Sequence, residues 1–101
     1  MYYFYVLYSL KDGKLYKGYT EKLGNRFIKH HYGGTRSTRN RRPLVLIYVE
    51  EFYSKREAMK RERWAKTADG GSALVERLIG LQILNPEKAL KLRTSSWLER
   101  P

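Results

Sequence analysis

The chain has 101 residues, the size of one ordinary domain, so we expect a single core without a separate recognition domain. It carries 21 Lys+Arg against 10 Asp+Glu, and the net charge of +11 favours a polyanionic partner, nucleic acid before an acidic membrane surface. The lack of cysteine excludes disulfides, a thiolate nucleophile and Cys-ligated zinc. No apolar run reaches the roughly 18–20 residues of a membrane span, and the first residues do not resemble a signal peptide. We therefore expect a soluble, cytoplasmic, basic protein.

Two apolar runs near the N-terminus predict a β-hairpin. Residues 2–8 form a continuous aromatic and β-branched run that is typical of a buried, central strand, and residues 15–19 return as a second strand. Between them, Gly13 can take the positive φ of a tight turn.

The register of this hairpin decides which tyrosines face one another. A loop of four residues, 10–13, pairs Leu7 with Tyr16, whereas a loop of three residues shifts the pairing by one. Because side chains alternate along a strand, we expect the four-residue loop to place Tyr5 and Tyr16 on the same face.

Helical periodicity and capping residues predict the segments that cover the strands. A first amphipathic helix is expected over 21–31, with Thr20 as its N-cap. Ser54 and Glu57 form a Ser-x-x-Glu capping box that opens a second helix. The other expected elements are a third strand over 44–52, the second helix over 55–66, a third helix over 73–84 and a final helical turn over 87–92.

The order β-β-α-β-α predicts an α+β fold, in which helices cover a three-stranded antiparallel sheet. We assign residues 1–68 to the core of the domain. Residues 69–101 are expected to be a helical extension that packs on the same domain and frays towards its end.

Glu62 is the most informative single position. A helical wheel places it beside Ala58, Met59 and Ala65, on the apolar stripe of the second helix. A buried carboxylate must be paired, protonated or bound to a metal, because an isolated buried charge is costly. The simpler alternative is a carboxylate at the edge of a narrow stripe, paired with a nearby Arg.

Other polar groups allow two interpretations each. Tyr5, Tyr16 and their neighbours on the hairpin either serve as amphipathic core residues or converge on a phosphate or a water. Arg26 and His30 are i and i+4 on the first helix, where His30 could be an ordinary packed side chain and Arg26 a phosphate ligand. The basic loop at 35–43 is either a solvated linker or a grip on flanking phosphates.

Four short segments occur in an order that resembles the GIY-YIG nuclease superfamily, in particular its small stand-alone bacterial members. They are Tyr3-Phe4-Tyr5, Tyr16-Lys17-Gly18, Arg26 with His30, and Glu57-Ala58-Met59-Lys60-Arg61-Glu62. The resemblance covers about residues 2–66. The chain departs from it at Tyr3, where the family has Gly, and at Lys17, where the family has an apolar residue.

The resemblance implies an endonuclease that hydrolyses DNA with one divalent ion, Mg²⁺ or Mn²⁺. It implies that Glu62 holds the metal and that Arg26 neutralises charge on the phosphoryl oxygens. Tyr5 would act as general base or orient the water, with a pKa lowered by the metal and Arg26. Tyr16 would position the water or contact the phosphate, and His30 would relay a proton or contact phosphate. The residues expected to bind nucleic acid are Arg36, Arg39, Arg41, Arg42 and Lys17.

Two alternatives remain at this stage. The chain could be a nucleic-acid-binding module that has lost cleavage, or a basic RNA- or ribosome-associated protein. Glu62 discriminates between these readings and the enzyme, since a carboxylate in a basic cleft repels phosphate and gives pure binding no benefit. We expect little sequence preference, or a partner protein that supplies it, and no membrane contact.

Overall fold

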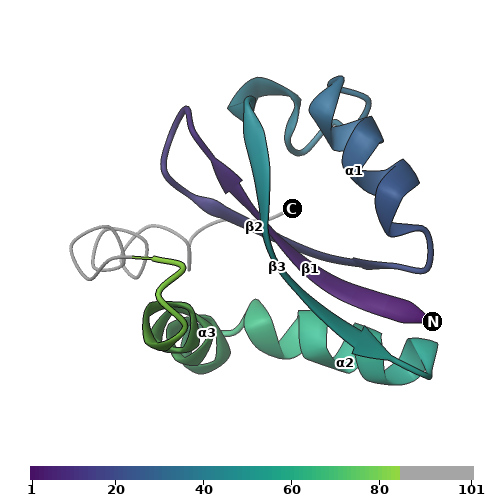
Figure 1. The fold of residues 1–101 in the computed structure, drawn as a ribbon, viewed down its shortest axis with the longest axis vertical. Helices are drawn as coiled ribbons and strands as arrows, with labels where there is room; N and C mark the ends of the chain where they lie inside the picture. The colour runs from purple at the N-terminus through teal and green to yellow at the C-terminus, as the bar shows by residue number, and fades with distance from the viewer. Residues whose placement is uncertain (85–101) are drawn as a thin grey trace.

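A three-stranded antiparallel sheet with the strand order β2-β1-β3 lies between helices on both of its faces (Figure 1). This computed structural model describes residues 1–84. The elements are β1 (Tyr2–Ser9), β2 (Leu15–Thr20), α1 (Leu23–His31), the short 3₁₀ helix η1 (Arg39–Arg41), β3 (Leu44–Phe52), α2 (Lys55–Ala65) and α3 (Ala68–Gly80). The predicted α+β class and antiparallel sheet are confirmed, as is the central position of β1.

The two faces of β1 bury different side chains, which explains its unbroken apolar sequence. On one face, Tyr5 and Leu7 pack with Phe27 of α1. On the other face, Phe4 and Val6 belong to the larger core beneath α2 and α3. Figure 1 shows α1 on one side of the sheet and α2 with α3 on the other.

The hairpin has the predicted four-residue loop. Leu7 pairs with Tyr16 and Tyr5 pairs with Gly18, so Tyr5 and Tyr16 share a face. Gly13 takes a φ of 71° in the turn, a conformation that glycine adopts without the steric penalty of a Cβ.

The first helix begins later than predicted. α1 starts at Leu23, with Lys22 as its N-cap and no side-chain cap. The predicted cap, Thr20, instead accepts a hydrogen bond at Oγ1 from the Lys22 N–H at 3.1 Å, in a turn that precedes the helix. Such a local turn competes with helix formation at Ser and Thr residues.

The second helix begins as predicted, but the third does not. Ser54 Oγ accepts a hydrogen bond from the Glu57 N–H at 3.0 Å at the start of α2. α3 begins at Ala68 and not near residue 73, capped by Thr67, whose Oγ1 accepts from the Gly70 N–H at 2.9 Å. The glycines at 70 and 71, which precede the predicted start of this helix, lie inside α3 and are buried. The helical turn expected over 87–92 lies outside the described residues.

A network of ion pairs and hydrogen bonds links α2 and α3 to strand β3. Arg61 donates two hydrogen bonds to Glu50, at 2.7 and 3.0 Å, and its guanidinium lies 4.0 Å from the centre of the Trp64 ring. Arg77 of α3 donates to the Tyr48 hydroxyl at 2.8 Å, and that hydroxyl in turn donates to Glu50. Burial acts to raise the pKa of Glu50, but the hydrogen bonds from Arg61 and Tyr48 outweigh it and hold the pKa below its usual value.

No helix within residues 1–84 has both the length and the apolar character needed to cross a membrane.

The corner between α2 and α3 generates a stability prediction. A Cβ on Gly70 would overlap the backbone carbonyl of Trp64, whereas a Cβ on Gly80 would meet nothing within 4 Å. Gly70→Ala should therefore lower the free energy of unfolding by about 1–3 kcal/mol, as overpacking does. Gly80→Ala, on the same helix, should leave it unchanged or raise it by up to about 1 kcal/mol. Urea denaturation of both variants measures the difference, and equal effects would show that the corner tolerates a side chain.

Candidate active site

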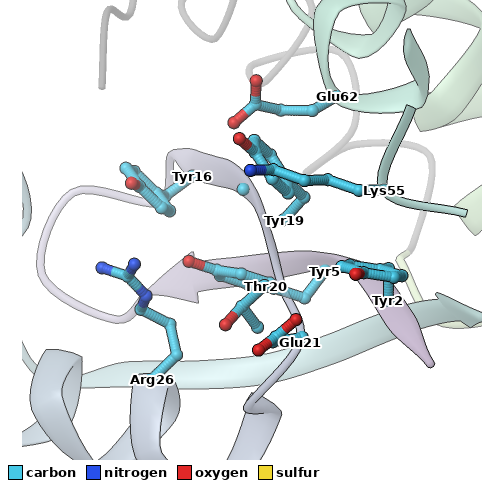
Figure 2. Close-up of a pocket in the computed structure, with 10 residues that line it drawn as sticks. Tyr2, Tyr5, Tyr16, Tyr19, Thr20, Glu21, Arg26, Lys55 and Glu62 are labelled. Carbon is cyan, nitrogen blue, oxygen red and sulfur yellow. The ribbon is translucent and has the colours of Figure 1, made fainter. Parts of the chain in front are cut away.

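A pocket of about 500 Å³ lies along the edge strand β2, where side chains from α1 and α2 meet (Figure 2). Its lining includes Tyr5, Tyr16, Arg26 and Glu62, four of the five residues for which the sequence predicted a catalytic role. The pocket therefore joins segments that are far apart in the chain, from both faces of the sheet.

Glu62 reaches the pocket from α2. Its neighbours on the helix, Ala58 and Ala65, are fully buried, and its own side chain is 21% exposed. One carboxylate oxygen lies 3.3 Å from Lys66 Nζ, an i,i+4 pair. The predicted alternative, a partner for the carboxylate, is thus also present, although the partner is a lysine. Figure 2 shows the carboxylate directed towards the hollow, near Lys55.

Gly18 allows the Tyr5 side chain to lie across the edge strand. A Cβ at position 18 would come within 2.5 Å of the Tyr5 hydroxyl oxygen. The two residues are directly paired in the sheet, so any side chain at 18 would displace the phenol. Sequence reasoning did not assign Gly18 to the site, although a glycine inside a strand is a signal for close approach.

A buried chain of hydrogen bonds extends from Tyr5 into the protein. The Tyr5 hydroxyl lies 3.1 Å from His30 Nε2, and His30 Nδ1 lies 2.7 Å from Thr38 Oγ1. Both His30 and Thr38 are fully buried. The alternative role of His30 as a phosphate contact is therefore wrong, because its ring does not reach the surface. Thr38 was missed, and no local sequence pattern pointed to it.

Burial sets the protonation of the hydrogen-bonded side chains Tyr5 and His30. It raises the pKa of Tyr5 well above its usual value, with a further contribution from the Tyr16 phenol, while Arg26 opposes the shift. Arg26 thus acts on the Tyr5 pKa in the expected direction, but burial outweighs the guanidinium, so the net pKa in the protein alone is raised and not lowered. Burial also lowers the pKa of His30 to about 4, helped by Arg26 and Lys29. At neutral pH both rings are uncharged.

Arg26 supplies the positive charge on the α1 side of the pocket. Figure 2 shows its guanidinium on the same side of the hollow as the Tyr5 and Tyr16 hydroxyls. Within residues 1–84 it forms no ion pair with a carboxylate. Its charge is therefore not neutralised by a neighbour, as a phosphate-binding group requires.

Two of the residues predicted to bind nucleic acid have structural roles instead. Lys17 is only 4% exposed, since it faces the core on the opposite side of β2 from Tyr16, so its assignment to the binding surface is wrong. Arg41 lies 3.2 Å from Asp12 and donates to the Leu15 carbonyl at 3.3 Å, which fastens η1 to the hairpin. The remaining members, Arg36, Arg39 and Arg42, are exposed but do not line the pocket.

The pocket fits a hard divalent cation of the magnesium type. Residues 1–84 contain no cluster of three or more His, Cys, Asp and Glu side chains, which argues against a cage made by the protein alone. Mg²⁺ usually keeps several waters and binds through one or two carboxylates together with substrate phosphates. Glu62 provides one such carboxylate, and Glu21 also lines the pocket.

Comparison with known proteins identified matches over the same part of the chain. The family model of the GIY-YIG catalytic domain matches residues 1–70. A UPF0213 protein of Staphylococcus saprophyticus is 47% identical over 66 residues, which cover 64% of this chain and 79% of the relative. A UPF0213 protein of Bacillus pumilus is 52% identical over 66 residues, which cover 64% of this chain and 66% of that relative. No solved structure gave a significant match.

The burial of neutral His30 predicts a pH-dependent stability. Between its pKa of about 4 in the folded protein and its ordinary value of 6.5, only the unfolded chain binds the proton. The free energy of unfolding should therefore fall by up to ~3 kcal/mol as the pH drops through this window. His30→Gln should flatten the dependence, and His31→Gln, at an exposed neighbouring position, should not. Denaturation at several pH values tests this, and an unchanged slope in His30→Gln would contradict it.

Proposed function

Because the chain belongs to the GIY-YIG catalytic domain family, we propose that it is a divalent-metal-dependent endonuclease that hydrolyses phosphodiester bonds in DNA. The observation that carries the proposal is the convergence of Glu62, Arg26 and Tyr5 on one pocket. A carboxylate among cations and phenols serves no purpose in simple phosphate binding, which it opposes. The combination matches the needs of phosphoryl transfer, in which charge must be stabilised and a water deprotonated.

Glu62 is the residue that would hold the metal. A bound Mg²⁺ or Mn²⁺ would supply Lewis-acid polarisation of the phosphate and stabilise charge on the leaving oxygen. In the protein alone, the Glu62 carboxylate is paired with Lys66. Lys66 therefore keeps the carboxylate neutralised until another cation replaces it.

Arg26 and Tyr16 would bind and orient the scissile phosphate. The planar guanidinium of Arg26 can donate two hydrogen bonds to phosphoryl oxygens. Tyr16 shares the face of Tyr5 and lines the same pocket, so its hydroxyl can hold the attacking water or a phosphate oxygen.

Tyr5, His30 and Thr38 would move the proton. In one His30 tautomer, Nδ1–H donates to Thr38 and leaves Nε2 free to accept the Tyr5 proton. Tyr5 can then take a proton from water while it passes its own to His30. The resulting hydroxide attacks phosphorus as the P–O bond to the leaving oxygen breaks, and that oxygen is protonated from solvent. Tyr5 then gives its proton to solvent and takes back the proton that His30 holds, which restores both neutral rings. A phenol with a raised pKa is able to do this because it need not ionise beforehand.

Supporting the DNA assignment are the net charge of +11 and the family. We propose little intrinsic sequence preference, because exposed lysines and arginines that contact phosphates position the nucleic acid without reading its sequence. DNA as substrate would place the protein in the bacterial cytoplasm. The alternative is a DNA- or RNA-binding module without cleavage.

Glu62→Gln and Arg26→Lys should each reduce plasmid nicking in Mg²⁺ at least 10²-fold, with the fold retained. Glu62→Gln removes the negative charge that would hold the metal, and Arg26→Lys keeps the positive charge but removes the planar guanidinium that donates two hydrogen bonds to the phosphate. Glu57→Gln removes the same charge from an exposed position of the same helix and should nick at the wild-type rate. Without metal, Glu62→Gln should bind DNA as well as the wild type or better. If the wild type never nicks, and Glu62→Gln only tightens binding, the binding module is the correct function.

Lys66→Met should lower the Mg²⁺ concentration needed for half-maximal nicking, because it removes the cation that competes for Glu62. A partly exposed pair of this kind is worth up to about 1 kcal/mol, which corresponds to a shift of roughly fivefold at most. Lys14→Met, which removes an equal charge outside the pocket, should leave the midpoint unchanged. A midpoint raised by Lys66→Met would show that Lys66 assists the site.

A further inference from the structure

The outer face of α2 carries positive charge that the fold does not use. Lys55, Arg56, Lys60 and Arg63 are all exposed. Within residues 1–84, none of the four forms an ion pair with an Asp or Glu side chain. The other cations of this region are already engaged, Arg61 with Glu50 and Lys66 with Glu62.

These four side chains belong to one face of the helix. At 100° per residue they lie within an arc of about 140°, with Met59 among them. Together the five residues line a groove of about 450 Å³, and we call them the α2 basic face. The acidic Glu57 lies outside the arc, so the charge of the face is of one sign.

Lys55 connects this face with the catalytic pocket. It lines both the groove on α2 and the pocket that contains Glu62. Figure 2 shows both Lys55 and Glu62 among the residues that line this pocket. A chain of phosphates that followed the groove would therefore reach the pocket at Lys55.

We propose that the α2 basic face binds the phosphate backbone of duplex DNA and leads one strand into the catalytic pocket. The choice of DNA as ligand rests on the proposed function. From residue 55 to residue 63 the helix rises about 12 Å. One strand of B-DNA presents a phosphate about every 3.4 Å along the axis, so the face spans about three to four phosphates.

The chemistry of the face favours this ligand over a membrane. A helix that binds a lipid surface buries a broad apolar face, and Met59 is the only apolar member of the α2 basic face. The exposed arginines of the loop are less suited to guide DNA into the site. Arg39 donates to the Gly33 carbonyl and Arg42 to the Arg39 carbonyl, each at 2.9 Å, and neither lines the pocket.

Two matched triple variants test the proposal. Arg56→Gln/Lys60→Gln/Arg63→Gln removes three charges from the α2 basic face, and Arg36→Gln/Arg39→Gln/Arg42→Gln removes three from the loop. Binding of a 20-base-pair duplex is measured in EDTA, without cleavage, between 50 and 200 mM salt. Each lost phosphate contact reduces the magnitude of the slope of log K against log salt by about 0.9. We therefore expect the slope of the α2 variant to be smaller in magnitude by about 2.7, and that of the loop variant by less than 1. At 50 mM salt the α2 variant should also bind at least tenfold more weakly.

An α2 variant that binds like the wild type, or a loop variant that loses as much, would overturn the proposal. The proposal would also be overturned if the wild type bound vesicles of anionic lipid more tightly than DNA and the α2 variant lost that vesicle binding. Failure of the proposed function would look different. If the salt slope of the α2 variant falls as expected but the wild type never nicks DNA in Mg²⁺, then the α2 basic face binds DNA and the proposed nuclease activity is wrong. Circular dichroism of both variants establishes that each remains folded.

Discussion

The phenol of Tyr5 crosses the edge strand of the sheet because residue 18 has no side chain, and the site depends on this close approach. From there the Tyr5 hydroxyl reaches His30 of α1, which in turn contacts Thr38 of the following loop. This buried chain fixes the position of α1 against the sheet and keeps both rings uncharged at neutral pH. The chain lies next to the surface on which α1 presents Arg26.

The second helix divides its surface among three tasks. Its buried side, Ala58 and Ala65, packs in the core, and Arg61 ties it to Glu50 of the sheet. Its margin places Glu62 in the pocket, and its outer side exposes cations. A small basic protein thus keeps an acidic group of α2 in the pocket where phosphate would lie. Such a group weakens binding of phosphate, so its presence favours chemistry over simple attachment.

Local patterns in the sequence predicted the strands, the hairpin register and the start of α2, because strand alternation and the Ser54 cap act over a few residues. They failed where the outcome depends on distant contacts. Gly70 lies inside α3, where the backbone carbonyl of Trp64 leaves no room for a Cβ. The residues next to Gly70 in the sequence give no sign of this contact. The burial of Lys17 and His30 likewise follows from the packing of helices on the sheet. Gly18 is the exception, because a glycine inside a strand is a local sign that another group approaches closely.

The central claim is that Glu62 holds a divalent cation beside the hairpin tyrosines when DNA is bound. The most direct measurement is paramagnetic broadening by Mn²⁺ of the protein's aromatic NMR signals, with a phosphorothioate duplex that resists hydrolysis. We expect broadening of the Tyr5 and Tyr16 ring signals that disappears in Glu62→Gln and persists in Glu57→Gln. Broadening that is unchanged in Glu62→Gln, or that affects signals near Glu50 and spares both tyrosines, would contradict it.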